Sequence, residues 1–169
     1  LEAQIRILKE EPFKCLPDFP TGGLMDARGY ADGKGSVKVR AKLKIKDEAT
    51  IVIKEIPPAT TTDTLIASIE NAVRKGKLKL KSVHDYTSED AEIEIKAPPG
   101  VDPEKLIDAL YAFTDCEVTI ASRIIVIRDH RPVEMTVSAM LRENTEQLCS
   151  LLRRELELKQ GKLEDELHF

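Results

Sequence analysis

The strongest chemical pattern in the chain is a row of cations in the stretch GSVKVRAKLKIKD, residues 35–47. Apolar residues alternate there with five cations: Lys38, Arg40, Lys42, Lys44 and Lys46. Side chains of a strand alternate between its two faces, so the pattern predicts one buried face and one cationic face. Same-face side chains repeat at about 6.8 Å, and a DNA strand offers a phosphate about every 3.4 Å along the helix axis. The row is therefore suited to contact backbone phosphates, without reading bases.

A structural interpretation of the same lysines is also open, and on the pattern alone it is the simpler one. Solvated sheet faces and edge strands often carry lysine. The strand-like stretch AEIEIKA, residues 91–97, places Glu92 and Glu94 on its polar face. If that strand lies beside the cationic one, cross-strand ion pairs explain both patterns. No aromatic residue lies among the cations, so base stacking is not expected.

The residues that usually do chemistry are scattered through the chain. His84, His130 and His168 are far apart, and the three cysteines, Cys15, Cys116 and Cys149, form no C-x-x-C pair. We therefore expect solvated histidines, a structural Cys116, and no metal or disulfide framework. The GKG stretch around Lys34 lacks the further glycines and the Ser or Thr of a phosphate-binding loop. No catalytic residue and no cofactor site is predicted within this chain.

The elements that must position the cations alternate between strands and helices. Strands are expected over residues 36–46, 50–56, 77–83 and 91–97, with one or two further strands over 117–129. Helices are expected over 61–76, 102–113 and from 136 to the end. Thr61, Thr62 or Asp63 is expected to cap the first helix, while Asp102 with Pro103 begins the second. Four residues of the second helix are expected to pack inward: Leu106, Ile107, Leu110 and Phe113. This order predicts an α+β fold, a two-layer sandwich with a mainly antiparallel sheet and helices on one face. The long C-terminal helix has little neighbouring chain to pack on, which is typical of a coiled-coil arm.

Composition narrows the class of protein. The 169 residues carry a net charge of −4, and no apolar run approaches the roughly 20 residues that span a membrane. Cysteine usage favours a reducing, cytoplasmic setting. The chain opens within a helical pattern and without Met, which suggests a piece of a longer protein.

Four stretches resemble one family. PDFPTGG (17–23), ADGKGSVKVRAKL, IVIKEIPPATTTDTLIASI and LYAFTDCEVTIASRIIVI are similar to segments of the breakage-reunion subunit of bacterial type IIA DNA topoisomerases, the A subunit of topoisomerase IV or DNA gyrase. The resemblance spans essentially the whole chain. It implies three regions: a helix end and Pro-rich linker over 1–23, an α/β tower domain over 24–134, and the start of a coiled-coil arm over 135–169.

The resemblance also implies what the parent protein does. Such enzymes pass one duplex through a transient break in another, as a homodimer of A subunits with a B subunit that binds ATP and Mg²⁺. The family's nucleophile is the tyrosine of an Arg-Tyr motif, whereas Tyr30, Tyr86 and Tyr111 follow Gly, Asp and Leu. This chain is therefore expected to be a non-catalytic piece that positions double-stranded DNA, in the cytoplasm at the nucleoid and not at a membrane.

The resemblance makes five cations candidate DNA contacts: Lys34, Lys38, Arg40, Lys42 and Lys44. Lys34 departs from the family pattern, which has Arg at that position, so a bidentate phosphate contact becomes a point charge. The alternative is a structural spacer and association module, in which carboxylates such as Glu92 and Glu94 neutralise the lysines. The DNA interpretation depends on a cationic face that is exposed and not neutralised.

Overall fold

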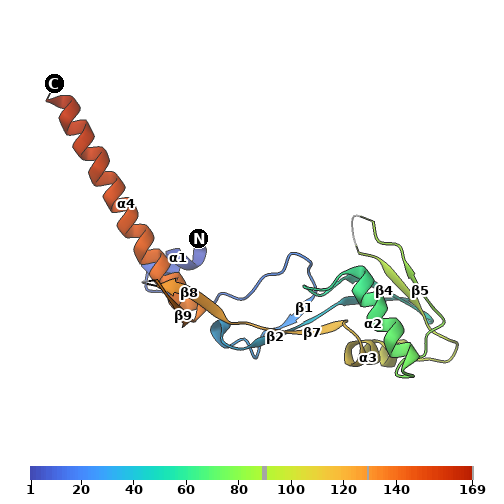
Figure 1. The fold of residues 1–169 in the computed structure, drawn as a ribbon. Coiled ribbons are helices and arrows are strands. Elements are labelled where there is room, and N and C mark those ends of the chain that lie inside the picture. Colours follow the sequence, from blue (N-terminus) through green and yellow to red (C-terminus); the bar gives the residue numbers. More distant parts are fainter. Residues whose placement is uncertain (89–90, 129, 169) are drawn as a thin grey trace. The chain divides into compact units, whose positions relative to one another are not determined.

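The computed structural model describes residues 1–88, 91–128 and 130–168, and the chain forms two compact units (Figure 1). Unit 1 contains residues 1–16, 31–35 and 123–169, and unit 2 contains residues 17–30 and 36–122. The elements are antiparallel strands and helices, which confirms the predicted α+β class. The three domain ranges predicted from the sequence concern a longer parent and stay a prediction.

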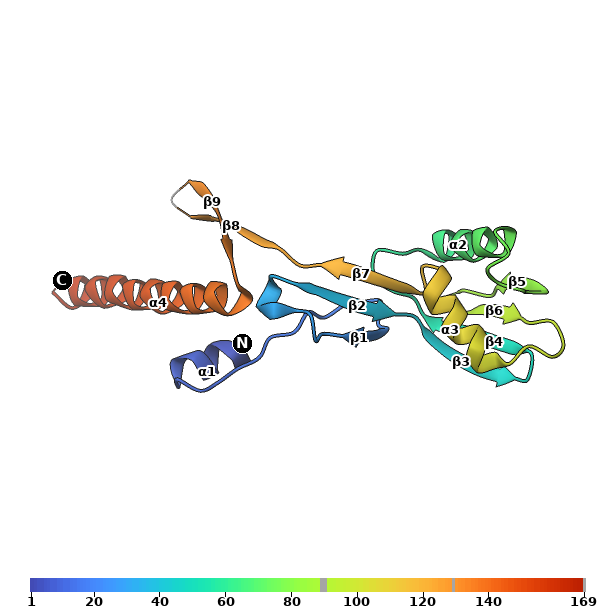
Figure 2. The same ribbon diagram turned by 90° about the horizontal axis from the view of Figure 1, so that it is seen from below.

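The main body of unit 2 is a four-stranded antiparallel sheet covered by two helices. Its strands are β3 (Lys42–Asp47), β4 (Thr50–Glu55), β5 (Ser82–Asp85) and β6 (Ile93–Lys96), in the order β3-β4-β6-β5. Helices α2 (Thr62–Arg74) and α3 (Pro103–Phe113) pack against this sheet (Figure 2). Alternate residues of β4 and β6 bury their side chains with those of both helices: Ile51, Ile53, Ile93, Ile95, Leu65, Ile69, Leu106 and Leu110. Both helices therefore cover one face, and the lysine-bearing face lies opposite.

Local signals begin and end the two helices as the sequence predicts. Thr61 caps α2 by accepting a hydrogen bond from the Thr64 backbone N–H, and Gly76 follows the helix with a φ of 70°. Asp102 caps α3, with Pro103 at its first position. These helices fix the ends of the loops that lead into and out of the sheet.

The strand predicted over residues 36–46 is in fact two strands in two sheets. Strand β2 (Ser36–Arg40) lies between β1 (Leu24–Asp26) and β7 (Glu117–Ala121) in a three-stranded sheet, and β3 belongs to the four-stranded sheet. Ala41 separates them: its N–H donates to the Cys116 carbonyl at 2.7 Å, and its carbonyl accepts the Tyr111 hydroxyl at 2.9 Å. These partners lie some 70 residues away, which is why the alternation of the sequence does not reveal the break.

Unit 1 is built around the long helix α4 (Val137–Leu167), capped by Thr136. It also contains α1 (Glu2–Leu8) and the 3₁₀ turn η1 (Ala31–Gly33). The strands β8 (Ile124–Arg128) and β9 (Arg131–Met135) form a hairpin, whose two strands are labelled in Figure 2. The Asp32 carboxylate accepts hydrogen bonds from the backbone N–H and hydroxyl of Ser138. Most leucines of α4 are exposed: Leu148, Leu151, Leu152, Leu156, Leu158, Leu163 and Leu167.

Two local predictions were wrong. Residues 77–81 form no strand, since β5 begins only at Ser82. Phe113 was expected to pack inward, but half of its surface is exposed at the end of α3, where it meets the Lys77 ammonium. The region 117–129, predicted as one or two strands, forms the two strands β7 and β8, and β8 pairs with β9, which was not predicted.

Candidate nucleic-acid interface

The first part of the predicted cationic row, on β2, is paired with one carboxylate. Glu117 on β7 lies 2.6 Å from the Arg40 Nε and 3.4 Å from the Lys38 ammonium. The guanidinium of Arg40 also lies over the Tyr111 ring, 4.8 Å from its centre. The hydrogen bond from Arg40 and the charge of Arg40, followed by the contact with Lys38, lower the pKa of Glu117 below its ordinary value. Both cations nevertheless keep more than half of their side-chain surface exposed, at 59% and 51%.

The next cation, Lys42, begins β3 and is paired with Glu55, which lies beside it at the end of β4. Its ammonium lies 2.8 Å from one carboxylate oxygen, and the other oxygen accepts the Gly23 N–H at 2.7 Å. Gly22 and Gly23 both have positive φ, and a Cβ on Gly23 would lie 2.8 Å from the Arg40 carbonyl. Glycine is required because the loop passes so close to the strand. The two glycines of PDFPTGG therefore have a structural role: they allow the loop to approach the strand, so that the Gly23 N–H binds the carboxylate that also pairs with Lys42.

The face of the four-stranded sheet opposite the helices carries the rest of the row together with cations of neighbouring strands. Glu94 lies between two of them, 2.9 Å from the Lys46 ammonium and 3.3 Å from that of Lys96. Lys54 pairs with Glu92 at 2.9 Å. Lys44 is exposed and takes part in no ion pair among the residues that the structure describes.

The ion pairs only partly match the neutralisation considered for the sequence. Glu92 and Glu94 do pair with lysines, but with Lys54, Lys46 and Lys96, while Glu117 and Glu55 pair with Lys38, Arg40 and Lys42. The contribution of Lys54 and Lys96 to this face was missed, although the alternation over 50–56 and 91–97 predicts it. Lys34, the fifth candidate, is exposed in unit 1, after η1, while the other four lie in unit 2.

Ion pairing leaves this surface cationic and accessible. Glu117 and Glu94 are each shared by two cations, so each triad keeps one uncompensated positive charge. The cations of these ion pairs are about half exposed, although the side chains of Glu94 and Glu117 are only 10% and 18% exposed. Surface ion pairs contribute about 0.2–1 kcal/mol, because water screens them and the side chains lose freedom. A phosphate can therefore compete with these carboxylates for the lysines. The geometry permits contacts between these cations and DNA phosphates, and the neighbouring carboxylates make those contacts weaker.

The described residues offer no catalytic constellation. All three histidines are exposed, and no cluster of three metal-ligating side chains occurs among residues 1–88, 91–128 and 130–168. Cys116 is fully buried, and burial raises the pKa of its thiol to about 11, as suits a structural cysteine. In the same described ranges, no helix is long and apolar enough to cross a membrane.

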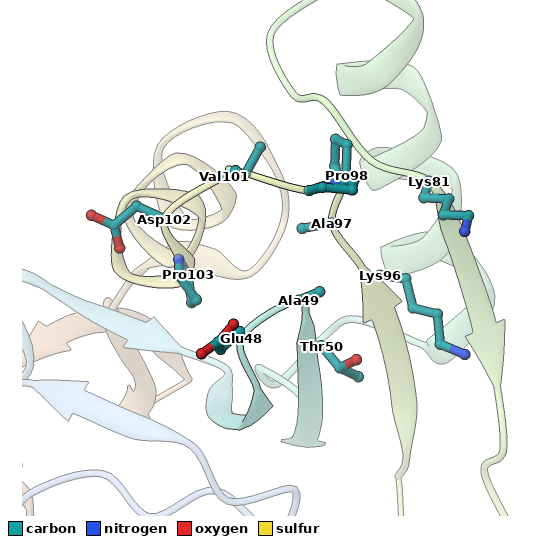
Figure 3. A pocket seen from close by; sticks show the side chains of 12 residues that line it. Glu48, Ala49, Thr50, Lys81, Lys96, Ala97, Pro98, Val101, Asp102 and Pro103 are labelled. Carbon is teal, nitrogen blue, oxygen red and sulfur yellow. The ribbon is translucent and has the colours of Figure 1, made fainter.

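A pocket of about 660 Å³ lies at the beginning of α3 (Figure 3). Lys81 and Lys96 on neighbouring segments line one side, and Glu48 and Asp102 lie on the other, among prolines and small residues. Asp102 uses its carboxylate to cap α3, by accepting the Glu104 N–H at 3.0 Å. The lining contains neither a nucleophile with a base nor a set of metal ligands, so the pocket adds no catalytic site.

Comparisons with known proteins support the resemblance seen in the sequence. The family model for the A subunit of DNA gyrase/topoisomerase IV matches residues 1–169. The chain is 40% identical over 159 residues to the DNA topoisomerase 4 A subunit of Borreliella burgdorferi, covering 94% of this chain and 25% of that protein. It is 32% identical over 168 residues to the DNA gyrase A subunit of Lawsonia intracellularis, covering 90% of this chain and 20% of that protein.

The chain thus spans about a quarter or less of the length of these relatives. The family match nevertheless extends over every residue, including the glycines that hold Glu55 and the strands that present the cations. We conclude that the chain belongs to the family of DNA gyrase/topoisomerase IV A subunits.

Proposed function

We propose that this chain positions double-stranded DNA beside the segment that a type IIA topoisomerase cleaves, and that it is not itself catalytic. The observation that carries the proposal is the exposed cationic surface of unit 2 in a chain of this family: Lys38, Arg40, Lys42 and Lys44, joined by Lys46, Lys54 and Lys96. Bending a duplex costs several kcal/mol, which contacts to the phosphates must offset. Lysines on a rigid sheet supply such contacts independently of sequence.

The activity of the parent enzyme is part of the same proposal. The parent is an ATP-dependent DNA topoisomerase whose A subunits form a dimer and act with a B subunit that binds ATP and Mg²⁺. It works in the cytoplasm at the nucleoid. The exposed leucines of α4 are the start of its coiled-coil arm, since a helix with an unpartnered apolar stripe is stabilised by a second helix.

The experiment is a titration of the 169-residue chain with a duplex of about 30 base pairs, at salt between roughly 50 and 200 mM. The double variant Lys38→Glu, Lys42→Glu is expected to bind more weakly and with a shallower salt dependence. The control Lys105→Glu, Lys162→Glu changes the net charge equally, at exposed lysines of α3 and α4. Equal binding by the wild type and the strand variant would contradict this role for the strand.

A second candidate function, a structural spacer and association module, is favoured by the ion pairs of Glu117 and Glu55. On that interpretation, the carboxylates and cations hold strands together, and α4 mediates association. It predicts that the wild-type chain does not bind the duplex even at the lowest salt. Wild-type binding that weakens steeply with salt would exclude it.

A further inference from the structure

The densest group of cations without carboxylate partners lies away from the predicted row, between α2 and β5. This basic segment, residues 74–81, contains five cations: Arg74, Lys75, Lys77, Lys79 and Lys81. No acidic residue occurs from Asn71 to His84. All five side chains are exposed, and none is in an ion pair with any residue that the structure describes. Lys77 instead lies over the Phe113 ring, 5.6 Å from its centre.

The backbone of the basic segment is held in place although it forms no strand. The Lys77 N–H donates to the Ala72 carbonyl at 2.9 Å, and the Lys81 N–H donates to the Lys96 carbonyl at 2.8 Å. Between them, Leu78 is buried in the core and Leu80 packs against it. Because the leucines point inward, Lys77, Lys79 and Lys81 alternate outward, about 7 Å apart in an extended chain. The segment therefore presents a fixed array of charges rather than a flexible tail.

Structural roles explain only part of this array. Arg74 and Lys75 suit the negative end of the α2 dipole. Lys81 precedes β5, an edge strand of the sheet, where lysine discourages unwanted strand pairing. Neither role applies to Lys79. Glu70, Asp115 and Glu48 line pockets together with these cations, but none of the three forms an ion pair with them among the described residues. Clustered like charges repel one another, so an array without ion-pair partners is best explained by a polyanionic partner.

We propose that the basic segment is a second contact surface for the phosphates of duplex DNA, and a stronger one than the β2–β3 row. This inference rests on the proposed function. Lysines without an ion-pair partner can contact a phosphate at no cost of breaking an existing ion pair. Lys38, Arg40 and Lys42, in contrast, must first separate from Glu117 or Glu55. Lys81 and Lys96 lie on neighbouring segments (Figure 3) and connect the basic segment to the lysine-bearing sheet face. The end of the basic segment thus adjoins the lysine-bearing face, whereas Arg74, Lys75 and Lys77 lie beside α2 and α3.

The test compares two triple variants of the 169-residue chain in titrations with a duplex of about 30 base pairs. Lys75→Gln, Lys79→Gln, Lys81→Gln removes three charges of the basic segment and leaves Lys77 on Phe113. The matched control, Lys9→Gln, Lys105→Gln, Lys162→Gln, removes three exposed charges that form no ion pair among the described residues. The first variant is expected to bind more weakly, with a salt slope shallower by about 0.9 for each phosphate that it no longer neutralises. The control is expected to keep the wild-type slope.

The outcomes separate this inference from the proposed function. If the wild type binds the duplex and both variants keep its slope, the basic segment is not a DNA contact while the proposed function stands. If the wild type does not bind the duplex, the proposed function fails and this inference with it. If the segment variant loses binding to polyglutamate but not to the duplex, the partner is an acidic protein and the inference is overturned.

Discussion

The β2–β3 row and the basic segment carry similar numbers of cations but differ in what surrounds them. In the row, Glu117, Glu55 and Glu94 lie within 3.4 Å of five cations of the sheets, counting Lys96 beside Lys46. In the basic segment, no carboxylate pairs with any of the five within the described residues. Regular alternation made the row conspicuous, yet the row is the partly neutralised one. If the basic segment binds the duplex as we propose, the density of cations in a stretch without acidic residues is the better guide to a phosphate-binding surface.

The largest expected effect tests how the basic segment is held. Leu78→Ala should lower the free energy of unfolding by about 3 kcal/mol, because it leaves a cavity where a buried leucine packed. It should also reduce duplex affinity, since the neighbouring lysines lose their fixed positions. Urea unfolding measures the first effect and titration the second. Leu163→Ala, at an exposed position of α4, is the control and should change stability by less than about 0.5 kcal/mol. A destabilised variant with unchanged affinity would show that the fixed array is unimportant.

The next effect compares a glycine in each region. Gly23 and Gly76 both have positive φ, but a Cβ on Gly23 would lie 2.8 Å from the Arg40 carbonyl, whereas nothing lies within 4 Å of one on Gly76. Gly76→Ala should cost about 1 kcal/mol from backbone strain alone. Gly23→Ala should cost about 2 kcal/mol or more, because the loop must also move away from the strand and from Glu55. Equal losses in urea unfolding would mean that the loop over Glu55 is not tightly packed.

These two regions also show what the sequence can and cannot predict. The caps of α2 and α3, the turn at Asp47 and the burial of Cys116 depend on neighbouring residues or on hydrophobicity, and all are predictable. The break at Ala41 and the pairing of Arg40 with Glu117 depend on residues about 70 positions away, so no local pattern reveals them. The segment 77–81 alternates like a strand, yet Leu78 and Leu80 face the helix-covered core without a pairing strand.

Acid should distinguish the two regions by stability. The pKa values of Glu117, Glu94 and Glu55 are lowered from 4.5, chiefly by hydrogen bonds from Arg40, Lys46 and Lys42, respectively. These carboxylates bind protons less readily in the folded chain than in the unfolded chain. The three ionised carboxylates therefore stabilise the fold above pH 4.5, and this stabilisation is lost as the pH falls through the lowered pKa values. Thermal unfolding between about pH 7 and pH 3 measures this loss. The variant Glu117→Gln, Glu94→Gln, Glu55→Gln should show a flatter profile, whereas the Gln variant of the basic segment should keep the wild-type profile.

The smallest effect tests whether the carboxylates restrain the strand cations. Glu117→Gln releases Lys38 and Arg40, which are about half exposed, and should strengthen duplex binding about two- to five-fold, the range expected when a surface ion pair no longer competes. The salt slope should become steeper, because released cations contact more phosphates. Glu157→Gln, at an exposed position of α4 without an ion pair among the described residues, changes the net charge equally. An identical gain in that control would assign the effect to net charge. No gain in Glu117→Gln would leave the basic segment as the surface that binds the backbone, because cations released from their carboxylate would still not contact phosphate.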